Sequence, residues 1–521
     1  MLTRNYRILL IAMIVAVVPV WTSCTDDLST SPIDDSEVTS DMIYEDPENF
    51  RKVLAKLYAG LAVTGQEGPA GSPDIDGIDE GFSSYIRQLW VTQELPTDQA
   101  VVAWPDPGLP GFNTQSWSPG NDFVMGMYSR IFYQITLANE FIRNARDEDD
   151  PQIQQYMAEA RFLRAFSYWH ALDLFGGNIP FVTEDDPIGA FEPEPVGSEE
   201  IFSYIESELM DIEDAMPAPQ ENQYGRADRA GVWMLLARLY LNAEVYIDEP
   251  RYDEAVTYTQ RIIDEGGYEL NSTYDQLFLA DNDEADGVIF AIPFDGNNTQ
   301  SFGGTNFIIH AAVGGSMSAA DFGISGGWEG HRVTPEFVDK FDKDNDVRAM
   351  FHTDGQNRDV DNLGDFNEGY AVTKWRNVTS TGEPGSRSAY VDTDFPMFRL
   401  ADVYLMYAEA TLRGGAGGDM NMALNLVNDI RERAYGDETG HITSDELDLD
   451  FILDERAREL YWEAQRRTDL IRYGYYTSAD YVWAWKGDTQ EGTSTSEHLK
   501  LYPIPSSDIN SNPNLTQNPG Y

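Results

Sequence analysis

Apolar residues recur with helical spacing over much of the chain. In residues 47–61 they fall three or four positions apart, and in residues 153–175 six of them lie on one stripe of a predicted helix. Gly176 and Gly177 follow that second segment, with Pro180 beyond, which is typical of a helix end. The pattern therefore predicts long amphipathic helices.

The same spacing predicts helices elsewhere, at residues 123–146, 201–216, 231–246, 252–266, 401–413, 420–434 and 444–473. Several are joined by short connections, so neighbours would pack as antiparallel pairs. In the pair formed by residues 232–243 and 252–263, Ala237, Ala243 and Ala255 leave room for close approach. No strict repeat period is present, so we expect a tetratricopeptide-like scaffold of helix pairs without a regular repeat.

Two stretches interrupt the helical pattern. Residues 65–120 begin with five glycines and two prolines before position 82, and residues 271–394 are rich in glycine, asparagine and aromatic residues. Apolar runs at 288–294 and 307–312 fit short strands in long loops better than helices. The expected fold is mainly α, with a loop-rich remainder that contains a few short strands and carries the binding surface.

The N-terminal region has the layout of a bacterial lipoprotein signal. Arg4 and Arg7 precede an apolar run at residues 8–20, and Cys24, the only cysteine of the chain, follows. Spanning a bilayer takes about 20 residues, so this run is typical of a cleaved signal peptide, with an uncleaved anchor helix as the alternative. We expect residues 1–23 to be the signal, Cys24 the lipidation site, residues 24–46 an acidic tether and residues 47–521 one domain.

The formal charge of the chain is -54. Removing residues 1–23 takes away two arginines and no acids, which makes the charge -56. A basic patch is the electrostatic footprint of a protein that binds nucleic acid or anionic lipid. The composition therefore disfavours nucleic acid, anionic lipid and anionic polysaccharide as partners.

Catalytic signatures are missing from the sequence. The six histidines form no H-E-x-x-H or comparable metal-binding spacing, and there is no G-x-S-x-G elbow and no Walker loop. A pair of acids would serve a glycosidase, but among 89 acidic residues some pair always looks suitable. The acidic residues 445–450 would suit calcium, yet they also suit the start of a helix. No cofactor is predicted.

Aromatic residues in the loops are more informative, because sugar rings present flat apolar faces that stack on aromatic planes. The loop regions contain Tyr85, Trp90, Trp104, Trp117, Phe302 and Trp328. Burial is the commoner fate of any single aromatic residue. Trp104 lies among prolines and a glycine, and Trp328 follows Ser325-Gly326-Gly327, so we predict that these two are exposed.

Four segments resemble the SusD/RagB family of outer-membrane lipoproteins. They are Ala158-Glu-Ala-Arg-Phe-Leu-Arg-Ala-Phe-Ser-Tyr-Trp, Phe398-Arg-Leu-Ala-Asp-Val-Tyr-Leu-Met-Tyr-Ala-Glu-Ala, Ile452-Leu-Asp-Glu-Arg-Ala-Arg-Glu-Leu with Arg466-Arg-Thr-Asp-Leu-Ile-Arg-Tyr-Gly, and the terminal Gln517-Asn-Pro-Gly-Tyr. The resemblance extends from end to end. It implies a non-enzymatic glycan or nutrient binder on the outer cell surface, whose helical side docks on a SusC-type TonB-dependent transporter.

The segments Gln93-Glu-Leu-Pro-Thr-Asp-Gln-Ala-Val-Val-Ala-Trp-Pro-Asp-Pro and Asp392-Thr-Asp-Phe-Pro-Met-Phe are similar to the starch-binding branch of that family. By position, the resemblance implies that Trp104 and Trp328 cradle a curved α-glucan and that Phe302 adds a third aromatic surface. Asp79 and Arg87 would bond sugar hydroxyls. Two departures are Pro107, where the branch has asparagine, and Phe302, where it has tyrosine.

Other functions remain open at the level of sequence. The same scaffold would serve another neutral glycan or a peptide nutrient. A surface glycosidase is a second class, and a third is a purely structural lid whose aromatic residues all belong to the core.

Overall fold

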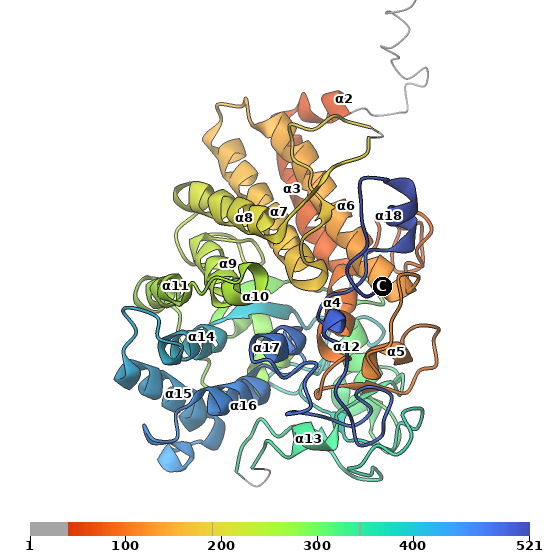
Figure 1. The fold of residues 1–521 in the computed structure, drawn as a ribbon, viewed down its shortest axis with the longest axis vertical. Coiled ribbons are helices and arrows are strands. Elements are labelled where there is room, and N and C mark those ends of the chain that lie inside the picture. Colours follow the sequence, from red (N-terminus) through yellow and green to blue (C-terminus); the bar gives the residue numbers. More distant parts are fainter. Residues whose placement is uncertain (1–39, 190, 343–344) are drawn as a thin grey trace, which may run out of the picture. The chain divides into compact units, whose positions relative to one another are not determined.

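The computed structural model describes residues 40–189, 191–342 and 345–521, and Arg51–Tyr521 form one compact unit. Helices dominate it (Figure 1). The α-helices are α2 (Ser40–Tyr44), α3 (Pro47–Ala62), α4 (Tyr85–Glu94), α5 (Pro110–Asn113), α6 (Asp122–Ala145), α7 (Pro151–Phe175), α8 (Ser198–Ile212), α9 (Arg229–Leu241), α10 (Ala243–Ile247), α11 (Tyr252–Glu265), α12 (Gly304–Ala312), α13 (Pro335–Val338), α14 (Leu400–Leu412), α15 (Met420–Tyr435), α16 (Leu449–Leu460), α17 (Arg466–Arg472) and α18 (Ser506–Ser511). The prediction of a mainly α fold is confirmed.

The long helices pack in chain order, as the helix-pair prediction requires. Helix α6 packs on α7, α7 on α8, α9 on α11, α11 on α14 and α14 on α15, and Figure 1 shows this series running down one side of the molecule. Ala237 and Ala255 are fully buried in the α9 and α11 pair. Small side chains therefore sit where these two helices meet.

Local sequence explains where these helices begin and end. The side chain of Asn121 accepts hydrogen bonds from the backbone N–H groups of Phe123 and Val124 and so caps α6. Asp150 caps α7 in the same way, and α7 ends at Gly176, whose φ of 75° favours glycine. The predicted glycine stop of this helix is confirmed.

The remainder of the chain contains short antiparallel strand pairs. They join β1 (Val101–Val102) to β5 (His331–Arg332), β2 (Ile179–Pro180) to β3 (Pro195–Val196), β4 (Val288–Ile292) to β8 (Phe395–Arg399), and β6 (Phe351–His352) to β7 (Ala371–Val372). The strand predicted near residues 288–294 is confirmed. Each pair joins segments that are far apart in sequence or connects the two ends of a loop. These short strand pairs therefore hold the loop-rich remainder in place.

Four predicted elements differ in the structure. Helix α4 lies inside the predicted loop 65–120, and α12 replaces a strand or loop at residues 307–312. Every residue of α12 is buried, so no face of this helix meets the solvent. The helix predicted at 231–246 is two helices, α9 and α10, and the helix predicted at 444–473 is also two helices, α16 and α17. Asp448 in the acidic stretch 445–450 caps α16 by accepting a hydrogen bond from the N–H of Phe451.

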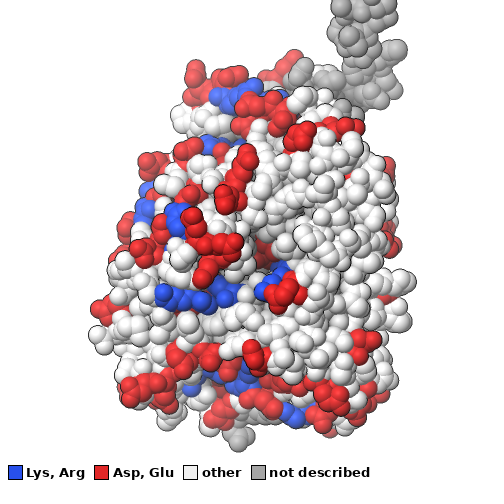
Figure 2. Space-filling view, viewed as in Figure 1, with Lys and Arg blue, Asp and Glu red and all other residues white. Residues whose placement is uncertain are grey.

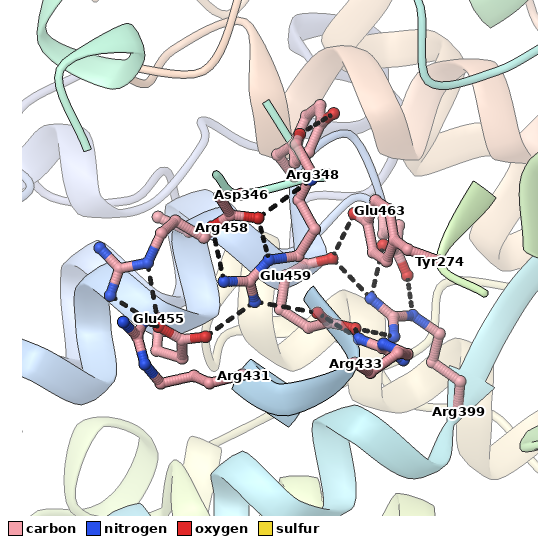
Figure 3. A network of polar contacts seen from close by, with 12 residues as sticks. Tyr274, Asp346, Arg348, Arg399, Arg431, Arg433, Glu455, Arg458, Glu459 and Glu463 are labelled. Atoms are coloured by element: carbon pink, nitrogen blue, oxygen red, sulfur yellow. Dashed lines mark hydrogen bonds and ion pairs between the residues drawn. The ribbon is translucent and has the colours of Figure 1, made fainter. Parts of the chain in front are cut away.

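A network of buried ion pairs fastens α16 to the loops (Figure 3). Glu459 is fully buried, and its carboxylate accepts hydrogen bonds from Arg399 and Arg433 at 2.6 Å and from Arg348 at 3.2 Å. Glu455 pairs with Arg348 at 2.7 Å. Because Arg348 and Arg399 come from distant segments, the network ties the loop region to the helical scaffold.

The surface is strongly acidic. Figure 2 shows carboxylate side chains, with Lys and Arg among them, mainly over the helical side and the two ends of one face, whereas the area over α18 carries few charged groups. Residues 501–521, which include α18, contain only one charged side chain, Asp508. This face of the molecule therefore combines an acidic helical side with a nearly uncharged C-terminal region.

The predictions for Cys24, the signal and most of the tether lie outside the described residues. Within the residues that are described, no helix is long and apolar enough to cross a membrane.

Candidate functional site

Trp104 and Trp328 are brought together by the pairing of β1 with β5. Val102 pairs with His331, and the N–H of Ala103 donates to the carbonyl of Gly330 at 2.8 Å. Trp104 follows Ala103 directly and Trp328 lies two positions before Gly330, so both tryptophans lie at the same end of this ladder. Backbone N–H groups of residues 328 to 330 donate in turn to carbonyls at the end of α12 and just beyond it, which fixes this segment on a buried helix.

The two tryptophans form what we call the tryptophan platform. The indole N–H of Trp104 donates to the carbonyl of Trp328 at 2.9 Å, and the ring centroids lie 6.3 Å apart with an interplanar angle of 47°. Both side chains are partly exposed, whereas Tyr85, Trp90 and Trp117 are buried in the core. The sequence pattern thus separated the partly exposed tryptophans from the buried ones.

Buried rings support the platform from below. The imidazole of His310 stacks on Trp328 with a centroid distance of 4.8 Å and an angle of 24°, and its Nδ1 lies 2.8 Å from the carbonyl of Gly326. The ring of His331 lies 5.1 Å from that of Trp104. Burial lowers the pKa of His310 and places that of His331 well below its usual range. Both histidines are therefore neutral at physiological pH and act as flat supports.

Arg87 connects the platform to the other predicted site residues. Its guanidinium lies 4.4 Å from the ring centroid of Phe307 and 6.0 Å from that of Trp104. Its Nη1 donates to the carbonyls of Gly81 at 2.9 Å and Phe302 at 3.1 Å. Burial lowers the pKa of Arg87 to about 10, with Asp106 and Asp79 opposing the shift. The group stays charged at neutral pH.

Asp79 lies in the same loop and binds Gly81 through the backbone N–H, whereas Arg87 binds the carbonyl of Gly81. Its carboxylate accepts a hydrogen bond from the N–H of Gly81 at 2.7 Å, and the carbonyl of Gly81 is the group that Arg87 binds. Asp79 is exposed, whereas Arg87 is partly buried. The two side chains therefore brace one loop through Gly81, and a carboxylate remains at the solvent side of the site.

Phe302 adds a further ring, paired with Tyr390, which the sequence did not single out. The rings of Phe302 and Tyr390 have centroids 5.9 Å apart, and both side chains are partly exposed. Tyr390 lies just before the segment that begins at Asp392 and resembles the starch-binding branch, which is the signal that pointed to this region. His310 had no comparable signal, because its role depends only on its position under Trp328.

The site is an open surface with aromatic faces, a guanidinium and carboxylates. Four cavities formed by the described residues, of ≈ 310 to ≈ 540 Å³, are lined by other parts of the chain. Over residues 40–189, 191–342 and 345–521, no group of three or more His, Cys, Asp or Glu side chains is arranged to hold a metal ion. Flat rings flanked by hydrogen-bonding groups suit stacking against an extended ligand.

Comparison with known proteins assigns the class to which this arrangement belongs. A model of the SusD family matches residues 353–521. Over 577 aligned residues, the chain is 36% identical to a SusD protein, and the alignment covers 100% of both chains. The chain belongs to the SusD family.

That relative is the starch-binding protein SusD of Bacteroides thetaiotaomicron. Solved structures agree on the fold. A SusD homologue from Bacteroides thetaiotaomicron has a TM-score of 0.73 at 20% identity and covers 91% of this chain and 97% of its own. The surface glycan-binding protein A of the same organism, solved in complex with laminarihexaose, has a TM-score of 0.71 at 20% identity and covers 91% of this chain and 99% of its own.

Proposed function

We propose that this protein captures starch-type α-glucans on the tryptophan platform. Glucose rings would stack on Trp104 and Trp328, Phe302 would provide a third surface, and Arg87 and Asp79 would bond hydroxyl groups. The full-length similarity to a starch-binding protein supports this ligand.

The geometry of the tryptophan pair carries the proposal. The two rings are partly exposed, inclined by 47° and held by the hydrogen bond from Trp104 to Trp328, so they present a bent surface. Hydroxyl hydrogen bonds largely exchange with water and contribute only about 1 kcal/mol each. Stacking on a surface that is already ordered would therefore provide most of the affinity.

The acidity of the chain favours a neutral ligand. With a formal charge of -54, the molecule repels anionic polysaccharides, whereas an uncharged glucan meets no such barrier. Asp79 is exposed at the rim of the site and can accept hydrogen bonds from hydroxyl groups. We infer that the protein acts by capture and release without cleaving the glycan.

We further propose that the captured glucan passes to a SusC-type TonB-dependent transporter at the outer membrane. Cys24 would hold the chain there through a lipid. Labelled palmitate should enter the wild-type chain and not Cys24→Ala, and the transporter should copurify with the lipidated chain. Label in the Cys24→Ala chain, or its normal retention at the membrane, would contradict the anchor.

The ligand is tested by calorimetric titration of the lipidated chain in detergent with maltoheptaose, beside laminarihexaose. Trp104→Ala and Trp328→Ala should each weaken maltoheptaose binding without lowering the melting temperature by more than a few degrees. Trp485→Ala is a matched control, because Trp485 is also partly exposed and its indole N–H also donates to a backbone carbonyl, that of Val360 at 2.7 Å.

Equal binding by Trp104→Ala and Trp485→Ala would contradict the platform. Binding of laminarihexaose alone would replace the α-glucan by a β-glucan. Incubation with maltoheptaose should produce no new reducing ends, and their appearance would make the protein a glycosidase.

A further inference from the structure

Tyr224 is oriented in the reverse sense of an ordinary surface tyrosine. The residue is 43% exposed, whereas the neighbouring Asp394 is only 5% exposed. Burial and the carboxyl group of Asp394 raise the pKa of the Tyr224 hydroxyl, so this hydroxyl lies toward the interior. A surface tyrosine usually buries its ring and keeps the hydroxyl in water. Here part of the ring meets the solvent instead.

The segment that carries this ring, residues 222–227, is held at several points, and we call it the Tyr224 ridge. Gly225 has a φ of +78°, and a Cβ there would lie 2.3 Å from Cγ of Pro293, so only glycine fits. The guanidinium of Arg226 binds the carboxylate of Glu159 through Nε at 2.9 Å and Nη2 at 2.5 Å. A ligand that binds here would not have to order the backbone first.

Two cavities flank the Tyr224 ridge and share its residues 223 to 226. One, of ≈ 320 Å³, is lined by polar groups that include Tyr268, Glu269 and Asp283. The other, of ≈ 310 Å³, is lined by apolar side chains that include Leu54 and Ile292. Each lies at the lower end of the roughly 300 to 1,000 Å³ that small-molecule sites occupy.

The chemistry of the ridge matches a sugar ring, which has apolar faces and a hydroxylated edge. Tyr224 offers an aromatic face, and Glu269 and Asp283 are exposed carboxylates that can accept hydrogen bonds from hydroxyl groups. An acidic sugar is disfavoured by the same carboxylates. A neutral pyranose could lie on the ring with its hydroxyl groups toward the polar cavity.

We propose that the Tyr224 ridge is a second saccharide-binding site, separate from the tryptophan platform, that takes one or two pyranose units of a neutral glycan. The choice of a saccharide as ligand rests on the proposed function. A second contact on the same chain would raise the time that a long glucan stays bound by making its rebinding intramolecular.

The test uses a lipidated chain that carries both Trp104→Ala and Trp328→Ala. This chain is titrated with maltotriose in detergent, and binding is followed by saturation-transfer NMR. Adding Tyr224→Ala should weaken the remaining binding by about fivefold, the worth of one aromatic contact. Phe191→Ala is the matched control, because Phe191 is 40% exposed and does not line either cavity. It should leave binding unchanged.

Asp283→Ala is a second variant in case Tyr224→Ala does not fold, since Asp283 is exposed and its removal should not affect folding. It should weaken binding as well. The second site is refuted if the chain with Trp104→Ala and Trp328→Ala binds no maltotriose. It is also refuted if adding Asp283→Ala, or adding Tyr224→Ala to a chain that still folds, leaves maltotriose binding as tight as adding Phe191→Ala does. The platform itself is judged separately, by whether Trp104→Ala and Trp328→Ala alter binding in the otherwise unmutated chain.

Discussion

A single methyl group at Gly330 should disturb the tryptophan platform without touching either tryptophan. Gly330 lies directly under the indole of Trp104, and a Cβ at this position would be 2.5 Å from Cζ2 and 2.6 Å from Cε2 of that ring. Carbon atoms in contact prefer about 3.5 to 4.0 Å. Gly330→Ala therefore requires the ring to move by about 1 Å.

The expected cost follows from what this movement breaks. Shifting the ring lengthens the 2.9 Å hydrogen bond from Trp104 to Trp328, which contributes about 1 kcal/mol. Overpacking costs about 1 to 3 kcal/mol in a closed core, and Trp104 is only partly buried, so the lower end applies. If a stacked ring contributes about 0.5 to 1.5 kcal/mol to ligand binding, displacing it weakens affinity roughly two- to tenfold.

Gly326→Ala is the matched control in the same loop. A Cβ at Gly326 would meet no heavy atom within 4 Å, and its carbonyl, which binds His310, is unchanged. Both substitutions reduce the entropy of the unfolded chain to the same extent. The difference between the two variants therefore isolates the collision with Trp104.

The assays are thermal unfolding and calorimetric titration with maltoheptaose. We expect Gly330→Ala to bind more weakly than Gly326→Ala and to melt at a slightly lower temperature. If the two variants bind equally while Gly330→Ala is less stable, the face of Trp104 is not a ligand surface. If they agree in both measurements, the reasoning from the contact distance is wrong.

Two further predictions concern buried carboxyl groups. Glu459→Gln should lower the free energy of unfolding in urea by about 3 to 5 kcal/mol, because Arg399, Arg433 and the other partners lose a buried counter-charge. Glu432→Gln is the control at an exposed position, and its free energy of unfolding should stay within about 0.5 kcal/mol of wild type. Burial alone would raise the pKa of Glu459, but its arginine partners outweigh burial and lower the pKa to about 2. The stabilisation is therefore present above the unfolded pKa of about 4.3 and is lost as the pH falls towards 2. If the unfolding free energy of Glu459→Gln fell with acid as steeply as that of wild type, this reasoning would be wrong. Burial raises the pKa of Glu94 to about 8, so its stabilising protonated form is lost as the pH rises through 8. Glu94→Gln should therefore gain melting temperature over wild type between pH 5 and pH 9, and a pH-independent difference would argue against the shift.

The sequence predicts helices well where one face of the helix meets water. Helix α15 was expected at residues 420–434 and spans Met420–Tyr435, and its buried residues lie on one face. The prediction fails for α4 and α12, which are short and enclosed on nearly every side. The charged residues of α16 are the opposite case, because Glu455 and Glu459 resemble solvent-facing positions and are fully buried.

The candidate site shows the same limit. Trp104 and Trp328 were singled out by their local sequence and by the family resemblance, and the structure places them in contact although 224 positions separate them. Their neutral support by His310 and the ring of Tyr390 beside Phe302 could not be found that way. Both depend on strand and helix pairings between distant segments, which no local pattern encodes.

Burial of paired charges explains why the outer surface is so acidic. Among the described residues, fourteen Asp and Glu side chains and thirteen Lys and Arg side chains are buried, so the interior nearly balances. The interior therefore removes almost none of the formal charge of -54, and the excess carboxylates lie outside, as Figure 2 shows for one face. A protein built this way can hold a neutral glycan on aromatic rings while it repels anionic polymers, and salt should weaken that repulsion much more than the stacking.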